Sequence, residues 1–345
     1  MTHAATLRAT VIAAFALCFC VVVLGAYVRL TAAGLGCPDW PGCYGHFTPV
    51  GAADVAVTGS EGTRQVHGYA RPLEVGKAWR EMAHRYAAGT LGVLIVFIAA
   101  MAIAWRREKL VSLPLAVSIL GIVVVQGIFG MLTVTWMLKP LIVTLHLLFG
   151  LTTLSLLWWL LLGLLVRGRG AWGSNTAFVG TVLPRARRLA LLGLVVLAVQ
   201  LFLGGWTSTN YAATACPDLP TCQGRWWPQA DFHDAYVLWR NADIDYQGGV
   251  LGNTARVAIH LTHRLGALVT TVVLLLAAAA ALRYRRDVFA RRAAQLLLLA
   301  LALQLLIGIS MVLRGFPLWI ATAHNAGAAL LLLATLALNR SLRPT

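Results

Sequence analysis

The sequence predicts an all-α integral membrane protein whose eight transmembrane helices form two tandem, parallel four-helix bundles. Three observations carry this prediction: the apolar share of the chain, the length of its apolar stretches, and an internal repeat. Of 345 residues, 59% are hydrophobic, whereas soluble domains have about 45–50%. Each apolar stretch is long enough to cross a bilayer core of about 30 Å. The stretches cover residues 10–28, 86–105, 111–134, 141–166, 189–207, 265–282, 293–313 and 318–338.

Each stretch reads as a helix. The first, 10–28, has the composition of a signal peptide, but no small-residue cleavage site follows it and its counterpart, 189–207, is internal. The second and sixth open directly after a His-Arg pair. The third and fourth begin beside Pro114 and Pro140, and the eighth begins beside Pro317, where proline suits a helix start. All are rich in Leu, Val and Ala and too long for barrel strands.

The second half of the chain repeats the first at an offset of 178 or 179 residues. An even number of helices in each unit gives both units the same orientation, so they are parallel repeats around an axis near the membrane normal. We expect residues 1–168 and 185–345 to form the two units. The pairs in register include Cys37/Cys216, Cys43/Cys222, His84/His263, Arg85/Arg264 and His146/His324.

The net charge of +16 reflects membrane topology and excludes a nucleic-acid partner. When both termini and the loops after helices two, four and six are assigned to one side, that side holds 16 of the 28 Lys and Arg residues. Of the 12 acidic residues it holds only Glu108 and Asp287. Because positive charge accumulates on cytoplasmic loops, we expect both termini in the cytoplasm of a bacterial cell (inner) membrane. The long loops 30–83 and 208–259 then lie outside.

Four of the six cysteines form two C-x5-C pairs in the outer loops. The pairs are Cys37 with Cys43 and Cys216 with Cys222. The outer side of a bacterial membrane is oxidising, which favours a disulfide within each pair. A metal site that uses all four thiolates is the alternative, although the C-x2-C spacing of such sites is absent. A disulfide here either stabilises its loop or exchanges electrons during turnover, and the sequence is compatible with both roles.

Four histidines lie near the outer ends of apolar stretches: His84, His146, His263 and His324. Ionisable groups in membrane helices are costly and are usually functional. A single one is often only hydrogen-bonded between helices, but four in repeat register favour a ligand role. Imidazoles on facing helices can hold a haem iron from both sides. The candidate ligand pairs are therefore His84 with His146 and His263 with His324.

Smaller and charged residues surround these histidines. Arg85 and Arg264 directly follow a candidate ligand, and each is placed to pair with a porphyrin propionate or to extend to the membrane surface. Gly150, Gly266 and Gly327 make room either for a flat macrocycle or for close helix packing.

The chain resembles the haem A synthase family over nearly its whole length. A Glu-x-x-His-Arg element combined with duplicated histidine pairs is specific for that family, whereas the C-x5-C pairs occur in only part of it. The matching pieces are Gly25–Leu30 before the first cysteine pair, Glu81–Arg85, Thr144–His146, His260–Arg264, and Ala323 with His324.

The resemblance implies a substrate, a cofactor and partners. The ring methyl at position 8 of haem O would be oxidised to a formyl group through successive hydroxylations, giving haem A for cytochrome oxidase assembly. The C-terminal half would hold haem b through His263 and His324, and the N-terminal half would receive haem O at His84 and His146. A membrane farnesyltransferase, haem O synthase, would supply the substrate. The electron acceptor or donor, the oxygen source and any homo-oligomer remain open.

Only the first half has a carboxylate beside its candidate ligands. Glu81 corresponds to His260 in the second half, and Glu81 shares a helical face with His84, three residues away. A site for proton-coupled oxidation needs such a group, whereas a structural cofactor site does not. We therefore expect Glu81 to be catalytic. The alternative is a carboxylate that stabilises a helix N-terminus.

Two other functions fit the same residues. A di-haem b cytochrome would pass electrons and keep two permanent haems. A transporter or haem-handling protein would also suit parallel repeats, although the Gly/Pro interruption that marks a mid-membrane substrate path is not apparent in any stretch. Identification of the bound pigments would separate these functions from haem A synthesis.

Overall fold

The computed structural model describes residues 2–50, 63–66, 69–167, 182–241, 244–283 and 288–343. Within these ranges, eight helices are long and apolar enough to cross a membrane. Each overlaps one of the predicted stretches, which confirms a multi-pass, all-helical membrane domain. The eight are α1 (His3–Leu30), α3 (Val75–Ala104), α4 (Leu113–Thr135), α5 (Pro140–Arg167), α6 (Val182–Thr209), α8 (Asn253–Leu282), α9 (Val288–Leu313) and α10 (Leu318–Ser341).

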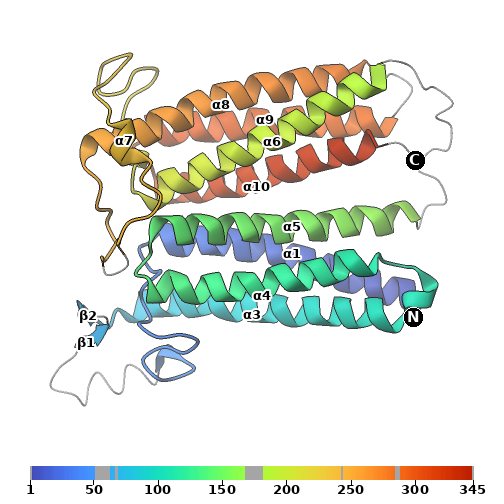
Figure 1. Ribbon diagram of the computed structural model, residues 1–345, viewed down its shortest axis with the longest axis horizontal. Helices are drawn as coiled ribbons and strands as arrows, with labels where there is room; N and C mark the ends of the chain where they lie inside the picture. Colours follow the sequence, from blue (N-terminus) through green and yellow to red (C-terminus); the bar gives the residue numbers. More distant parts are fainter. Residues whose placement is uncertain are drawn as a thin grey trace.

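The helices lie in two groups of four, side by side (Figure 1). In the first group, α1 and α4 each pack against both α3 and α5. In the second, α6 and α9 each pack against both α8 and α10. This arrangement is compatible with two tandem bundles. The chain ends lie at one end of the molecule, and the long loops lie at the other (Figure 1). The predicted unit boundary, 168–185, falls largely outside the described residues and stays a prediction.

Prolines begin three of the helices, as predicted. Pro114 lies in the first turn of α4, Pro140 is the first residue of α5, and Pro317 caps α10. Proline suits these positions because the first backbone N–H groups of a helix have no intrahelical acceptor.

The predicted starts of two helices are wrong. α3 begins at Val75 and α8 at Asn253, well before the predicted starts at 86 and 265. Charged and polar residues interrupt the apolar pattern there, but loop partners bind their side chains and the helical backbone continues. His84 and His263 therefore lie inside helices, whereas the apolar pattern predicted that they lie at the starts of the spans.

The outer loops add small elements that the apolar pattern did not reveal. β1 (Thr63–Val66) and β2 (Tyr69–Pro72) form an antiparallel hairpin, with Thr63 opposite Pro72. The second loop carries the short helix α7 (Phe232–Ala235). Strands of four residues are too short for alternation to be recognised.

The two groups meet through α1 and α5 of the first and α6 and α10 of the second. Polar contacts cross this boundary. The indole N–H of Trp158 donates to the Leu333 carbonyl at 3.1 Å, and the Arg29 guanidinium donates to the Ser208 carbonyl at 2.6 Å. In a membrane, helices associate through close packing and such hydrogen bonds more than through hydrophobic burial.

Candidate functional site

In both halves a glycine of the first helix faces the first candidate ligand. His84 on α3 packs against Gly25 of α1, where a Cβ atom would lie 2.9 Å from His84 Cε1. His263 on α8 packs in the same way against Gly204 of α6, at 3.2 Å. A side chain at Gly25 would force the His84 ring to shift, and one at Gly204 would make an unusually tight contact with the His263 ring.

The second candidate ligand of each half has the same environment. A Cβ atom on Gly130 of α4 would lie 3.5 Å from His146 Cε1, and one on Gly308 of α9 would lie 3.1 Å from His324 Cε1. The two histidines of each half are close enough for their charges to interact. His84 and His146 therefore lie near each other, as do His263 and His324, and their pairing as ligands of one iron stays a prediction.

Glutamine side chains hold three of the four histidine segments. Gln126 donates to the His146 carbonyl at 2.9 Å and Gln304 donates to the His324 carbonyl at 3.2 Å. Gln200 donates to the His263 carbonyl at 3.0 Å, and its amide nitrogen lies 3.1 Å from His263 Nδ1. Gln200 was missed in the sequence because its counterpart is Val21, so the repeat did not mark it. The presence of a polar glutamine within the apolar stretch 189–207 could have identified it.

Three glycines, for which the sequence allowed either a flat macrocycle or close helix packing, accommodate these glutamines. A Cβ atom on Gly266 would collide with the Gln200 side chain, and one on Gly327 would collide with that of Gln304. On Gly150 it would lie 3.0 Å from Gln126 Nε2. Their role in the structure is therefore close packing of the polar side chains that support the histidines.

The first histidine pair has unused donor and acceptor atoms. Within the described part of the chain, His84 Nδ1 and His146 Nδ1 are buried and make no hydrogen bond. Burial of an unpaired polar atom is costly. The same part of the chain has no cluster of three or more His, Cys, Asp or Glu residues that could hold a metal ion. Paired imidazoles alone suit an iron whose other ligands come from a porphyrin.

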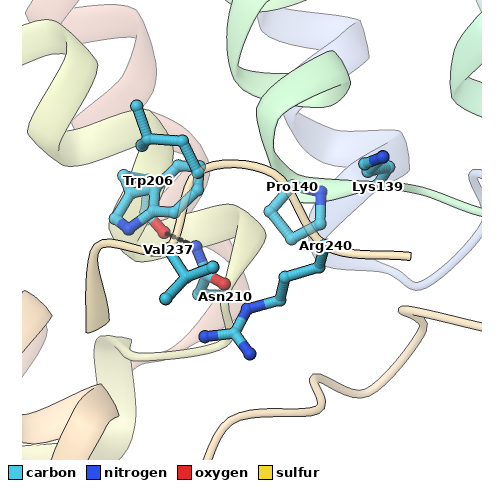
Figure 2. Close-up of a pocket in the computed structure, with 7 residues that line it drawn as sticks. Lys139, Pro140, Trp206, Asn210, Val237 and Arg240 are labelled. Atoms are coloured by element: carbon cyan, nitrogen blue, oxygen red, sulfur yellow. Dashed lines mark hydrogen bonds between the residues drawn. The ribbon is translucent and has the colours of Figure 1, made fainter. Parts of the chain in front are cut away.

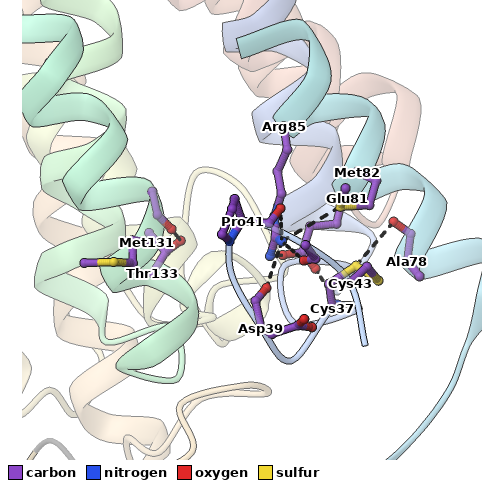
Figure 3. A network of polar contacts seen from close by, with 12 residues as sticks. Cys37, Asp39, Pro41, Cys43, Ala78, Glu81, Met82, Arg85, Met131 and Thr133 are labelled. Carbon is purple, nitrogen blue, oxygen red and sulfur yellow. Dashed lines mark hydrogen bonds and ion pairs between the residues drawn. A yellow bond between two sulfur atoms is a disulfide. The ribbon is translucent and has the colours of Figure 1, made fainter. Parts of the chain in front are cut away.

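Glu81 lies beneath the first disulfide loop (Figure 3). Its side chain is buried, at 4% exposure. One carboxylate oxygen accepts the Cys37 N–H at 2.9 Å, and the other is paired with Arg85. Because α3 begins at Val75, Glu81 is not at the helix N-terminus, and the alternative of a helix-stabilising carboxylate is not supported.

Both candidate propionate arginines bind loop carbonyls. Arg85 donates to the carbonyls of Asp39 at 2.8 Å and Gly42 at 2.5 Å (Figure 3). Arg264 donates to those of Thr221 and Cys216, both at 2.8 Å. The arginines therefore attach each disulfide loop to the helix that carries a histidine, and a role with propionates stays a prediction.

The two outer cysteine pairs lie at disulfide-bonding distance, Cys37 with Cys43 and Cys216 with Cys222. An aspartate shapes each loop. Asp39 accepts the N–H groups of Tyr44 at 2.5 Å and Gly45 at 2.7 Å.

Asp218 shapes the second loop in the same way, accepting from Gln223 at 2.6 Å and Gly224 at 3.0 Å. A hydrogen bond from the Thr221 hydroxyl, together with these amides, lowers the pKa of Asp218 below its ordinary 3.8. Since the fold favours ionised Asp218, its contribution to the free energy of unfolding is fully present at neutral pH. That contribution is lost only as the pH falls through the lowered pKa.

The second half replaces the carboxylate with an imidazole. His260 is as buried as Glu81, and its Nδ1 lies 3.1 Å from the Ala212 carbonyl. The two halves therefore share their histidines, glycines and disulfide loops. They differ in the titratable group next to the first ligand, as the sequence indicated.

These features describe a multi-pass membrane protein whose eight long helices lie in two groups of four, each with a buried histidine pair beneath a disulfide loop. Residues 8–336 match the family described as cytochrome oxidase assembly protein. The chain is 43% identical to a haem A synthase of Shewanella oneidensis over 92% of this chain and 91% of that protein. It is 28% identical to those of Methylobacterium radiotolerans (93% and 86%) and Nitrosospira multiformis (95% and 91%). The chain belongs to the haem A synthase family.

Proposed function

We propose that this protein is a haem A synthase of a bacterial cell membrane, which oxidises the C8 methyl group of haem O to a formyl group. Family membership over nearly the whole chain supports the reaction. The observation that carries the assignment of sites is the difference between the repeats. Both have the histidine pair, and only the first has a buried carboxylate next to it, at Glu81. The first half is therefore the substrate half.

In this proposal His84 and His146 bind the iron of haem O, and their free Nδ1 atoms and neighbouring glycines suit that role. His263 and His324 hold haem b, with Gln200 and Gln304 orienting them. Bound haem b supplies a one-electron redox centre. Partners outside a metal's direct ligands fix the orientation of ligating histidines, which is the role that the glutamines have here.

Glu81 is proposed to take up a proton released from the substrate methyl group. It lies one turn before His84 on α3, on the same helical face. Arg85 and the Cys37 amide hold its two oxygens in a fixed orientation. A fixed, water-poor position is what a general base requires.

The remaining assignments are also proposals. Arg85 and Arg264 bind the outer disulfide loops, and we assign them to the propionates of the two haems. Both termini are cytoplasmic on the charge asymmetry. Haem O synthase would deliver the substrate, and an unidentified electron acceptor or donor would complete the reaction. A homo-oligomer is left open.

Analysis of the bound pigments tests the function. Protein purified from cells that make haem O should contain haem b together with haem O or haem A, identified by chromatography and mass. Two molecules of haem b per chain, with no haem O or haem A, would contradict the proposal and indicate an electron-transferring cytochrome.

The glycine contacts give a first prediction. Gly25→Ala would place a methyl group 2.9 Å from the His84 ring. Since that distance is below any ordinary carbon contact, the imidazole must move. We expect haem A formation to fall at least ~10-fold while the haem b spectrum of the second half persists. Gly204→Ala, against His263, should instead disturb the haem b spectrum. The prediction fails if both variants change the same spectral component.

The cysteine pairs give a second prediction. In protein prepared without reductant, Cys37–Cys43 and Cys216–Cys222 should each be oxidised, because both lie on the proposed outer side. Alkylation followed by peptide mass mapping measures this. Loss of one bond should disturb its loop more than the helices, since closing so short a loop contributes only ~2–3 kcal/mol. Free thiols at all four positions, or cross-linking between the loops, would contradict the prediction.

A further inference from the structure

A buried lysine lies in the turn between α4 and α5. Lys139 is only 1% exposed, and its ammonium group makes no hydrogen bond within the described part of the chain. The ammonium group makes two cation–π contacts: Nζ lies 3.5 Å from the centre of the Trp239 ring and 5.2 Å from that of Trp136. Lysine is almost never fully buried unless it is paired. Within the described residues, this buried ammonium therefore lacks the hydrogen-bonded partner that such a charge normally has.

The structure fixes the lysine in place. The two residues before it, Met137 and Leu138, have left-handed backbone conformations, with φ of 50° and 60°. Such conformations are unfavourable for residues other than glycine and persist where the surroundings impose them. The second outer loop packs against this turn, since Tyr246 is buried there and donates its N–H to the Met137 carbonyl at 3.1 Å.

The position of Lys139 relates it to the candidate substrate site. Pro140 next to it is the first residue of α5 (Figure 2), and His146 follows on that helix. Lys139 directly precedes α5, and residues seven apart along a helix are separated by about 10 Å along its axis. This separation is comparable with the distance from the iron of a tetrapyrrole to the carboxylates at its edge. The free ammonium is therefore at the depth that such a carboxylate would reach.

Other cations near this edge already have partners. Arg85 binds loop carbonyls and Glu81, and Arg29 donates to Ser208 and lies 4.0 Å over the Tyr211 ring. At the 178-residue offset, the counterpart of Lys139 is Pro317. The cation, like Glu81, is thus a feature of the first half only.

We propose that Lys139 binds a carboxylate side chain of the tetrapyrrole substrate in the first half, as a positioning residue for the reaction. The inference rests on the proposed function, which places the substrate iron between His84 and His146. A charge-assisted hydrogen bond at a site shielded from water is stronger than an exposed one. Trp239 then forms the outer cover of the ion pair.

Binding of a tetrapyrrole with and without free carboxylates tests this proposal. Mesohaem and its dimethyl ester are titrated onto detergent-solubilised, full-length protein that retains its haem b. The first-half site is identified as the absorbance component that disappears in His84→Ala. In wild type, mesohaem should bind this site at least ~10-fold more tightly than the ester, the value of one hydrogen bond to a charged group. Lys139→Met should lose that preference, Lys139→Arg should keep most of it, and Lys77→Met should keep all of it.

Lys77 is a matched control because it is a half-buried lysine at the same end of the first half, paired with Glu74 at 2.6 Å. If Lys139→Met weakens the binding of mesohaem and of its ester equally, the preference for mesohaem persists. The proposal is then wrong, and Lys139 only anchors Trp239. If no component depends on His84, the assignment of the substrate site fails, and this inference fails with it. A His84-dependent component that does not distinguish acid from ester overturns the role of Lys139 alone.

Discussion

Glu81→Gln is expected to yield a protein that keeps its haem b but makes little haem A. Glutamine preserves the shape of the side chain and can still accept the Cys37 N–H, which Glu81 accepts at 2.9 Å. It cannot take up a proton as a base. General-base catalysis typically contributes ~100–10,000-fold, so haem O or an alcohol intermediate should accumulate. Chromatography of the extracted haems measures the ratio.

The ion pair with Arg85 is lost in the same variant, so loop integrity needs its own control. Mass mapping of the Cys37–Cys43 bond shows whether the loop is intact. His260→Gln changes the equivalent position in the second half and should leave haem A formation within about two-fold. If Glu81→Gln makes haem A at nearly the wild-type rate with an intact loop, the carboxylate only anchors the loop.

His263→Ala and His324→Ala are each expected to abolish the low-spin, six-coordinate spectrum of haem b. Each imidazole would be one of two axial ligands, and removal of either leaves the iron five-coordinate or empties the site. Optical and electron paramagnetic resonance spectra of purified variants report this directly. His260→Ala is the matched control, because His260 is also buried on α8 but bonds the Ala212 carbonyl. An unchanged six-coordinate spectrum in both variants would contradict the assignment of these ligands.

Much of the fold was predictable because bilayer thickness dictates the length of apolar stretches. The eight spans and the prolines at helix starts followed from the pattern. The starts of α3 and α8 did not follow, since Arg80, Glu81 and Arg85 look like loop residues by composition. Glu81 and Arg85 bind the folded disulfide loop, and Arg80 donates to the Gly76 carbonyl one turn earlier in α3. These contacts, which the sequence does not show, accommodate the charged side chains within the helix.

The candidate site was predictable where the repeat marked it. Histidines and cysteines in register were visible in the sequence, as was the exchange of Glu81 for His260. Gln200 and Lys139 were not, because each occurs in one half only and its meaning depends on tertiary contacts. The partners of Arg85 and Arg264 were also hidden, since a loop carbonyl leaves no trace in the sequence.

The contact between Arg29 and Ser208 bears on how a protein of this kind could have arisen. Ser208 is the residue 179 positions after Arg29, so each occupies the place of the other in its own unit. In a symmetric dimer of identical units, a residue that touches its own counterpart touches a copy of itself. Two copies of the N-terminal unit would bring two guanidinium groups together here, with mutual repulsion. In a single chain that contains both units this restriction is absent, and the Arg29 guanidinium and the Ser208 carbonyl form an asymmetric contact between unlike units.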